Sequence, residues 1–179
     1  MPSYKLLVNG QQHTVEADAD MPLLYALRGE LGQKGPRFGC GLAQCGACTV
    51  ILNDTAVRSC TLPISAATNT AIRTLDGLGT ETAPHPVQAA FIEEEAAQCG
   101  YCTNGWIMTA VAALEQNPRR SDAELKQMYS GLKCRCGTHM AIMRATRKAA
   151  GMMAQPLAGT RTRDYNALPE SQEVKHEQA

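Results

Sequence analysis

Short stretches that contain apolar and β-branched residues, separated by turn-forming residues, mark the first half of the chain and are typical of strands. Residues 6–8 and 13–15 are two such stretches, and they flank Asn9-Gly10, a dipeptide that favours tight hairpin turns. A second hairpin is predicted over residues 49–59 and a last strand over residues 71–75. The pattern therefore predicts a small sheet built largely from hairpins.

A helix is predicted between the two hairpins. Pro22, a residue tolerated in a first helical turn, opens a stretch whose leucines recur at helical spacing: Leu24, Leu27 and Leu31. Residues 35–48 are rich in glycine and cysteine and are predicted to be loop. Residues 1–78 thus form one mixed unit of strands and helix.

The character of the chain changes to helix in the second half. Four helices are predicted: one after Pro86 up to residue 97, one ending near Asn117-Pro118, one opening at the capping box Ser121-x-x-Glu124, and one over residues 138–150. Four short helices indicate a small bundle over residues 79–155, so the predicted fold class is α+β. Residues 156–179 are polar without apolar periodicity and are predicted to be a tail.

The composition indicates that these two units need a stabilising feature besides their apolar cores. The chain has 179 residues and only 4% aromatic residues, so two small cores would be thin and would need a metal, a disulfide or a partner. Lys+Arg and Asp+Glu both number 17, which gives no reason to expect nucleic-acid binding. No apolar stretch approaches the roughly 18 residues of a membrane span, so membrane insertion is not expected.

The beginning of the chain lacks the apolar segment of a signal peptide. We therefore expect a cytoplasmic protein, with export in complex with a partner left open. Stable disulfides are then an unexpected use of the eight cysteines.

The first four cysteines have the spacing of a plant-type ferredoxin. Cys40, Cys45 and Cys48 share one loop, and Cys60 follows beyond a hairpin. Glycines among them permit the tight bends and close N–H approach that a [2Fe–2S] cluster needs. Zinc is bound by two close cysteine pairs, which Cys40 and Cys60 do not complete. This set therefore predicts a [2Fe–2S] cluster over zinc or disulfides.

The other four cysteines are Cys99, Cys102, Cys134 and Cys136. Two close pairs of this kind fit zinc as well as a cluster. Each pair directly precedes a predicted helix, and the positive ends of two helices favour thiolates and an anionic cluster. The residues alone favour a second [2Fe–2S] cluster and leave zinc open.

Taken together, the cysteine motifs resemble those of a known family. The motifs are Gly39-Cys-Gly-Leu-Ala-Gln-Cys-Gly-Ala-Cys-Thr-Val50, Arg58-Ser-Cys60, Gln98-Cys-Gly-Tyr-Cys102 and Leu132-Lys-Cys-Arg-Cys136. Over residues 4–150 the chain is similar to the small iron–sulfur subunit of molybdenum hydroxylases, the xanthine oxidase family. The resemblance implies a β-grasp ferredoxin domain, then a four-helix domain with its own [2Fe–2S] cluster on the second set of cysteines.

The resemblance also implies a large partner subunit that carries molybdopterin, often as the cytosine dinucleotide. Gln98 and Cys136 match family positions that contact this cofactor, although on residues alone Gln98 could simply cap a helix end. The implied electron path runs from molybdenum to the helical-domain cluster, then to the ferredoxin-domain cluster and an acceptor, either a cytochrome c or a flavin subunit. No residue of this chain is expected to be catalytic.

Two departures from the common family motifs indicate a branch. Cys102-Thr-Asn-Gly105 replaces Cys-Thr-Pro-Gly, and Cys134-Arg-Cys-Gly-Thr-His139 replaces Cys-Arg-Cys-Thr-Gly-Tyr. The second form is similar to the nicotinate dehydrogenase and isoquinoline oxidoreductase branch, which implies an N-heteroaromatic substrate on the partner. Three alternatives stay open: the small subunit of a molybdenum aldehyde dehydrogenase, a stand-alone ferredoxin, and a zinc-stapled interaction module. We interpret His139 as structural, since both cysteine sets are complete without it.

Overall fold

The strands form one mixed sheet. The computed structural model describes residues 1–155, and the predicted tail, 156–179, lies outside them. The five strands are β1 (Ser3–Val8), β2 (Gln11–Glu16), β3 (Thr49–Leu52), β4 (Thr55–Arg58) and β5 (Ala71–Arg73). Their order is β2-β1-β5-β3-β4, with β1 parallel to β5 and every other neighbouring pair antiparallel. Both predicted hairpins and the last strand are confirmed.

The predicted helix after Pro22 is present but short and wide. It starts as α1 (Leu23–Tyr25) and continues as a π-helical turn, η1 (Ala26–Glu30), in which the Leu31 N–H donates to the Ala26 carbonyl at 3.1 Å. Two 3₁₀ turns that the pattern did not predict follow later, η2 (Ile64–Ala67) and η3 (Leu75–Gly77).

The four predicted helices are confirmed, with changed ends. They are α2 (Pro86–Glu93), α3 (Thr103–Gln116), α4 (Asp122–Met128) and α5 (His139–Ala154). Helix α2 stops before the predicted residue 97 because Glu95 adopts a left-handed φ of 48°, which turns the chain toward the cysteines that follow. Together with the sheet, these helices confirm the α+β class. Among residues 1–155, no helix has the length and apolar character needed to cross a membrane.

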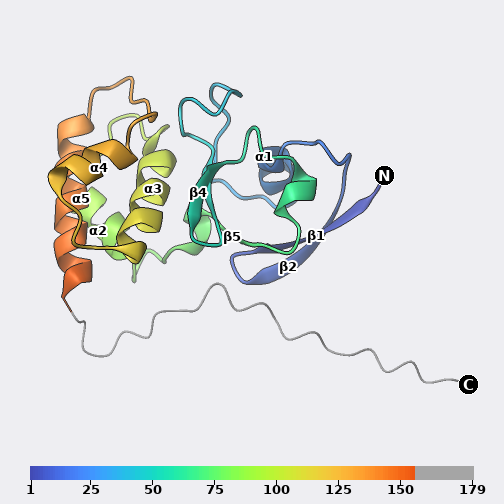
Figure 1. Ribbon diagram of the computed structural model, residues 1–179, viewed down its shortest axis with the longest axis horizontal. Coiled ribbons are helices and arrows are strands. Elements are labelled where there is room, and N and C mark those ends of the chain that lie inside the picture. The colour runs from blue at the N-terminus through green and yellow to red at the C-terminus, as the bar shows by residue number, and fades with distance from the viewer. Residues whose placement is uncertain (156–179) are drawn as a thin grey trace, which may run out of the picture.

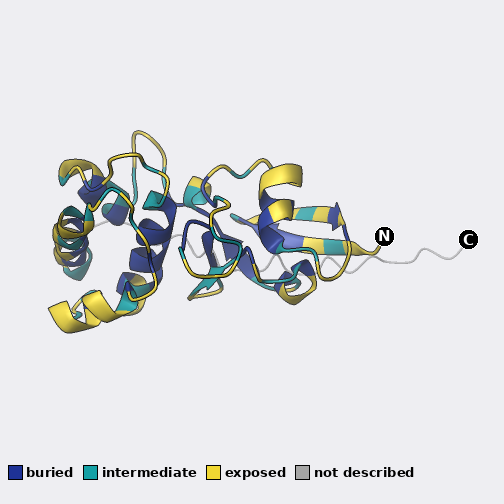
Figure 2. Cartoon of the chain, turned by 90° about the horizontal axis from the view of Figure 1, so that it is seen from above, coloured by how far each residue is buried: buried dark blue, intermediate teal, exposed yellow. Residues whose placement is uncertain are grey.

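Helix α3 lies between the sheet and the other helices (Figure 1). Successive side chains of a strand point to opposite faces, so β3 contributes to two cores. Val50 packs with Leu23 and Leu27 of the α1–η1 segment, whereas Ile51 packs with the apolar residues of α3. Buried residues accordingly gather where the sheet meets α3, and exposed residues line the outer helices (Figure 2).

An ion pair links the two halves at the far end of α3. Arg73 of β5, whose side chain is only 8% exposed, donates from its two terminal guanidinium nitrogens to the Glu115 carboxylate at 2.9 and 3.0 Å. His85, the N-cap of α2, places its Nε2 3.5 Å from the same carboxylate. Because bidentate Arg–carboxylate geometry is directional, this contact fixes α3 against the sheet.

Candidate metal centres

The first four predicted ligands come together as two pairs of thiols. Cys40 and Cys45 interact at the surface of the 35–48 loop. Cys48 and Cys60 interact beneath them, buried against Leu24 of α1. Burial raises the pKa of the Cys48 thiol to about 11, and the neighbouring Cys60 side chain contributes in the same direction. A thiolate at this depth therefore needs the positive charge of a metal beside it.

The outer pair is set up to be ionised. Three backbone N–H groups, of Leu42, Gln44 and Cys45, donate to Cys40 Sγ at 3.4, 3.2 and 3.3 Å. Burial raises the pKa of Cys40, but the three donors outweigh it and lower the pKa to about 7. The bend that aims these N–H groups inward passes through Gly41 at a φ of 67°, a conformation that glycine adopts without strain.

The second four predicted ligands also form two pairs. Cys102 lies beside Cys134, and Cys99 beside Cys136. Along the sequence, Cys99 and Cys102 form one close pair, and Cys102 is the N-cap of α3. Cys134 and Cys136 form the other close pair and come just before α5. The prediction that each sequence pair precedes a helix is therefore confirmed.

Within the inner pair the two thiols differ. Burial raises the pKa of Cys102 to about 11, with Cys134 raising it further and the nearby Trp106 side chain opposing. Burial also raises the pKa of Cys134, but the Thr138 hydroxyl, 3.3 Å away, and the Thr138 N–H outweigh it and lower the pKa to about 7. Thr138 thus favours the thiolate that a metal ligand must become.

Both sites fit a two-iron cluster. In a [2Fe–2S] cluster each iron binds two thiolates, whereas zinc gathers four thiolates around one ion. The thiols at both sites are arranged two and two. The N–H donors aimed at Cys40 supply the hydrogen bonds that an anionic cluster requires.

The two cysteine loops are joined directly by hydrogen bonds. The N–H of Lys133 donates to the Cys45 carbonyl at 3.2 Å, which links a ligand position of the first set to the neighbour of Cys134. Arg37 donates to the Gly100 carbonyl at 2.8 Å and lies over the Tyr101 ring, 5.6 Å from its centroid. The two sites are therefore held in one rigid arrangement.

Helix α3 contributes a second link through its first turn. Asn104 is 2% exposed, and its Nδ2 donates to the carbonyls of Ala47 and Thr49, both at 2.9 Å. Next to it, Gly105 packs directly on the backbone of Gly46. The carbonyls that Asn104 binds belong to the sequence neighbours of Cys48, and Asn104 and Gly105 closely follow Cys102. The first turn of α3 therefore sets the spacing of the two sites.

The other predicted contact residue, Gln98, is exposed, as is its neighbour Cys99. Tyr101, two residues after Cys99, is 49% exposed. The edge of the second site that carries Gln98 is thus open at the surface, whereas Cys102 faces the helix bundle.

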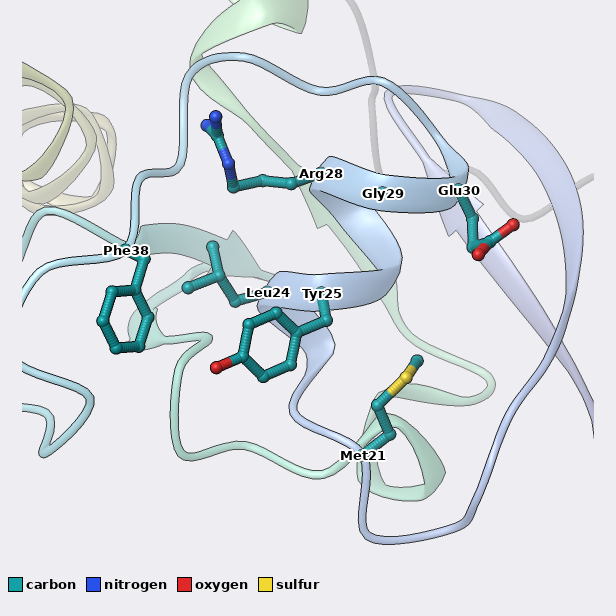
Figure 3. A pocket seen from close by; sticks show the side chains of 7 residues that line it. All are labelled: Met21, Leu24, Tyr25, Arg28, Gly29, Glu30 and Phe38. Carbon is teal, nitrogen blue, oxygen red and sulfur yellow. The ribbon is translucent and has the colours of Figure 1, made fainter.

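A groove of about 440 Å³ lies beside the first site (Figure 3). Leu24, which packs on Cys48 and Cys60, lines it together with the exposed rings of Tyr25 and Phe38. The two rings are stacked with centroids 6.4 Å apart. One leucine side chain therefore separates this apolar surface from the buried thiols.

Three residues that act at these sites were not predicted from the sequence. The Trp106 side chain lies beside Cys102, Thr138 hydrogen-bonds the Cys134 thiol, and Asn104 joins the loops. The first two follow Cys102 and Cys134 by four positions, and that spacing was a signal available in the sequence. Asn104 stood out only as a departure from a motif.

Comparisons with known proteins match each site to a domain family. Residues 6–73 match the family described as "2Fe-2S iron-sulfur cluster binding domain", and residues 74–147 match "[2Fe-2S] binding domain". The fold and the two sites thus define an iron–sulfur protein with two cluster-binding domains.

Full-length relatives narrow this class. The chain is 54% identical to one subunit of the nicotinate dehydrogenase of Pseudomonas putida over 151 residues, which is 84% of this chain and 96% of that protein. It is 44% identical to the alpha subunit of isoquinoline 1-oxidoreductase from Brevundimonas diminuta, with 82% and 96% covered. The chain belongs to the small iron–sulfur subunits of molybdenum hydroxylases, as its motifs predicted.

Solved structures agree with this assignment. Quinoline 2-oxidoreductase from Pseudomonas putida 86 matches with a TM-score of 0.80 and 30% identity, over 85% of this chain and 95% of the matched chain. The aldehyde oxidoreductase of Desulfovibrio desulfuricans matches with a TM-score of 0.82 and 36% identity, over 86% of this chain and 17% of that chain. The ferredoxin-like first part of the fold is thereby confirmed.

Proposed function

We propose that this chain carries electrons from a molybdopterin site on a large partner subunit to an external acceptor through two [2Fe–2S] clusters. The observation that carries the proposal is the arrangement of eight free thiols as two sites of two pairs each, joined by hydrogen bonds between their loops. Residues 1–78 and 79–155 are proposed as the two cluster-binding domains.

The thiol pairs suggest which residues share an iron. In the first site one iron is held by Cys40 and Cys45, and the other by Cys48 and Cys60. In the second site the pairs are Cys99 with Cys136 and Cys102 with Cys134. When bound, each cluster accepts and releases one electron at a time.

The chain's own contribution is to hold the two sites at a fixed spacing. The Lys133 N–H bond to the Cys45 carbonyl is a short bonded connection between a ligand of one site and the neighbour of a ligand of the other. Asn104 and Gly105 keep the loops from separating. A fixed spacing supports transfer inside this chain, with little rearrangement as electrons arrive and leave.

The exposed edge of the second site is proposed to face the partner. Gln98 and Cys136 are proposed to contact the molybdopterin, in its cytosine dinucleotide form, and the exposure of Gln98 and Cys99 is what such a contact requires. The first site then faces the acceptor, for which a cytochrome c or a flavin subunit is proposed. In this arrangement the chain contributes electron transfer alone, and the substrate reacts on the partner subunit.

The proposed substrate class is N-heteroaromatic compounds. Relatives named for nicotinate, isoquinoline and nicotine support it at 54%, 44% and 38% identity. An aldehyde is the second candidate, because the iron–sulfur-binding subunit of an Escherichia coli aldehyde oxidoreductase is also 38% identical. The proposed compartment is the cytoplasm, where thiols stay reduced until they bind metal.

Iron analysis and EPR of the purified complex test the proposal. We expect about four iron atoms per chain and two distinct signals on reduction. Cys45→Ser removes one signal and Cys102→Ser the other, each with loss of about two irons, while molybdenum stays bound. Ala43→Ser, an exposed change in the first cysteine loop, keeps both signals.

Each variant is also expected to block turnover with the natural acceptor. A colourless protein that contains zinc alone would overturn the proposal. So would either cysteine variant that keeps both signals, and full turnover by either would show that electrons do not pass through both sites in series.

A further inference from the structure

Trp106 is the chain's only tryptophan, and it lies directly beside the second site. It follows Cys102 by four residues in the first turns of α3, so the two side chains share one face of the helix. The residue is only 4% exposed. Its ring is held between Tyr129, at a centroid distance of 4.8 Å, and His139, at 5.6 Å in a T-shaped contact.

The polar atom of this ring has no ordinary partner. Within the described residues, Trp106 Nε1 is buried and has no well-aligned acceptor. A buried N–H that is left without an acceptor is costly, and tryptophans in cores usually satisfy it. The group that the Trp106 side chain reaches is the sulfur of Cys102. When Cys102 binds metal as a thiolate, its sulfur becomes a stronger acceptor and offers this N–H a partner.

A second side-chain donor reaches the same thiol pair. The Thr138 hydroxyl lies 3.3 Å from Cys134 Sγ, and Cys134 is the thiol that contacts Cys102. At the first site, Cys40 receives three hydrogen bonds from backbone N–H groups. At the second site, side-chain donors from Thr138 and Trp106 lie beside the Cys102–Cys134 pair, so substitutions can remove them without changing the backbone.

We propose that the Trp106 indole N–H donates to the sulfur at Cys102 and raises the reduction potential of the cluster in the helical half, with Thr138 acting in the same direction at Cys134. Reduction adds one electron and therefore one negative charge to the site, and no bond to the chain forms or breaks. An N–H···S bond stabilises the more negative state more strongly. This inference rests on the proposed function, since it takes Cys102 and Cys134 as ligands.

Trp106→Phe in the assembled complex tests the inference, because phenylalanine keeps a ring in the stack and removes the N–H. In a redox titration followed by EPR, we expect the reduction equilibrium constant of the helical-half cluster to fall roughly tenfold, or about 59 mV for one electron. The signal of the other cluster keeps its potential and serves as the internal reference. Pulsed EPR of the wild type is expected to detect an exchangeable indole proton coupled to the cluster, absent in the variant.

Two further variants keep the test decisive. Tyr129→Phe changes the same aromatic stack, but its hydroxyl bonds Thr146 at 2.6 Å and not sulfur, so it is expected to leave both potentials unchanged. Thr138→Val is expected to lower the same potential as Trp106→Phe, and it decides the question if the latter does not retain its cluster.

Unchanged potentials in Trp106→Phe and Thr138→Val, with both EPR signals present, would overturn the inference, as would an equal shift in Tyr129→Phe. A wild-type complex that lacks iron or the second signal would instead contradict the proposed function.

Discussion

Gly105→Ala tests whether the first turn of α3 sets the spacing of the two sites. A Cβ on Gly105 would lie 2.8 Å from the carbonyl carbon of Gly46 and closer still to its oxygen, whereas ordinary contact begins at 3.4 Å. The obstructing atoms are backbone, so no side chain can rotate away. Overpacking costs about 1–3 kcal/mol, and the helix propensity of alanine returns at most about 1 kcal/mol. We expect a net loss of about 2 kcal/mol, or roughly 4–8 °C in the apparent Tm.

Gly151→Ala is the matched control for this substitution. Gly151 also lies in a helix, α5, but a Cβ there would meet nothing within 4 Å. The same chemical change is therefore expected to raise the apparent Tm by roughly 2–4 °C.

The assay combines thermal unfolding of the iron-loaded complex with EPR of the fully reduced state. Because Gly105→Ala pushes the loop of Cys48 away from α3, the magnetic interaction between the two clusters is expected to weaken. Gly151→Ala leaves it unchanged. If Gly105→Ala were as stable as the wild type and kept the same magnetic interaction, the contact between Gly46 and Gly105 would not control the spacing.

Three further substitutions test other links in the fold. Glu115→Gln leaves Arg73 without its carboxylate and is expected to cost roughly 2 kcal/mol in urea unfolding, less than for a fully buried pair because Glu115 is partly exposed. Although burial raises the pKa of Glu115, hydrogen bonds with His85 and Arg73 hold it below its usual value. The deficit is therefore full at pH 7, begins to shrink as the pH falls through the ordinary glutamate pKa of about 4.3, and is lost only below the lowered pKa of the folded state; a deficit that persists at still lower pH would contradict this cause. Asn104→Ala removes two hydrogen bonds between the loops and is expected to cost about 2 kcal/mol and weaken the magnetic interaction, and unchanged EPR spectra would contradict its linking role. Ser121→Ala removes the N-cap of α4 and is expected to lower the apparent Tm by roughly 2–4 °C for a loss of about 1 kcal/mol without altering either EPR signal.

Local sequence predicted the elements because their signals are local. The Asn9-Gly10 turn has both residues at positive φ, 51° and 80°, which is what this dipeptide favours, and the hairpin pairs as expected. The Ser121–Glu124 capping box likewise forms within four residues. The end of α2 was harder to predict, because residues 94–97 have helical composition and only the left-handed Glu95 stops the helix. The composition of the chain gave no warning of that conformation.

The same distinction between local sequence signals and tertiary contacts applies to the cysteine sites. Spacing predicted the first set of four ligands and left zinc open for the second, whose placement before α3 and α5 followed from helix periodicity. The pairing of thiols across the loops is a different kind of information. Cys48 and Cys60 come together because β4 runs antiparallel to β3 and brings the chain back to the same end of the sheet. Cys102 and Cys134 come together only because α3 and α5 pack against each other. Such contacts depend on tertiary packing, which spacing along the chain does not contain.

The contacts between the halves explain why neither cysteine site is a separable module. Ile51 of β3 is buried in the core of the helical half, and Asn104 of α3 satisfies carbonyls on both sides of Cys48. A ferredoxin-like sheet without α3 would expose one apolar face, and a helical half without the sheet would lose the surface on which α3 packs. Loss of either cluster is therefore expected to loosen the other half through α3. The same helix begins next to Cys102, a proposed ligand, and carries Trp106, so the packing of the halves, the spacing of the sites and the proposed Trp106 bond all depend on one element.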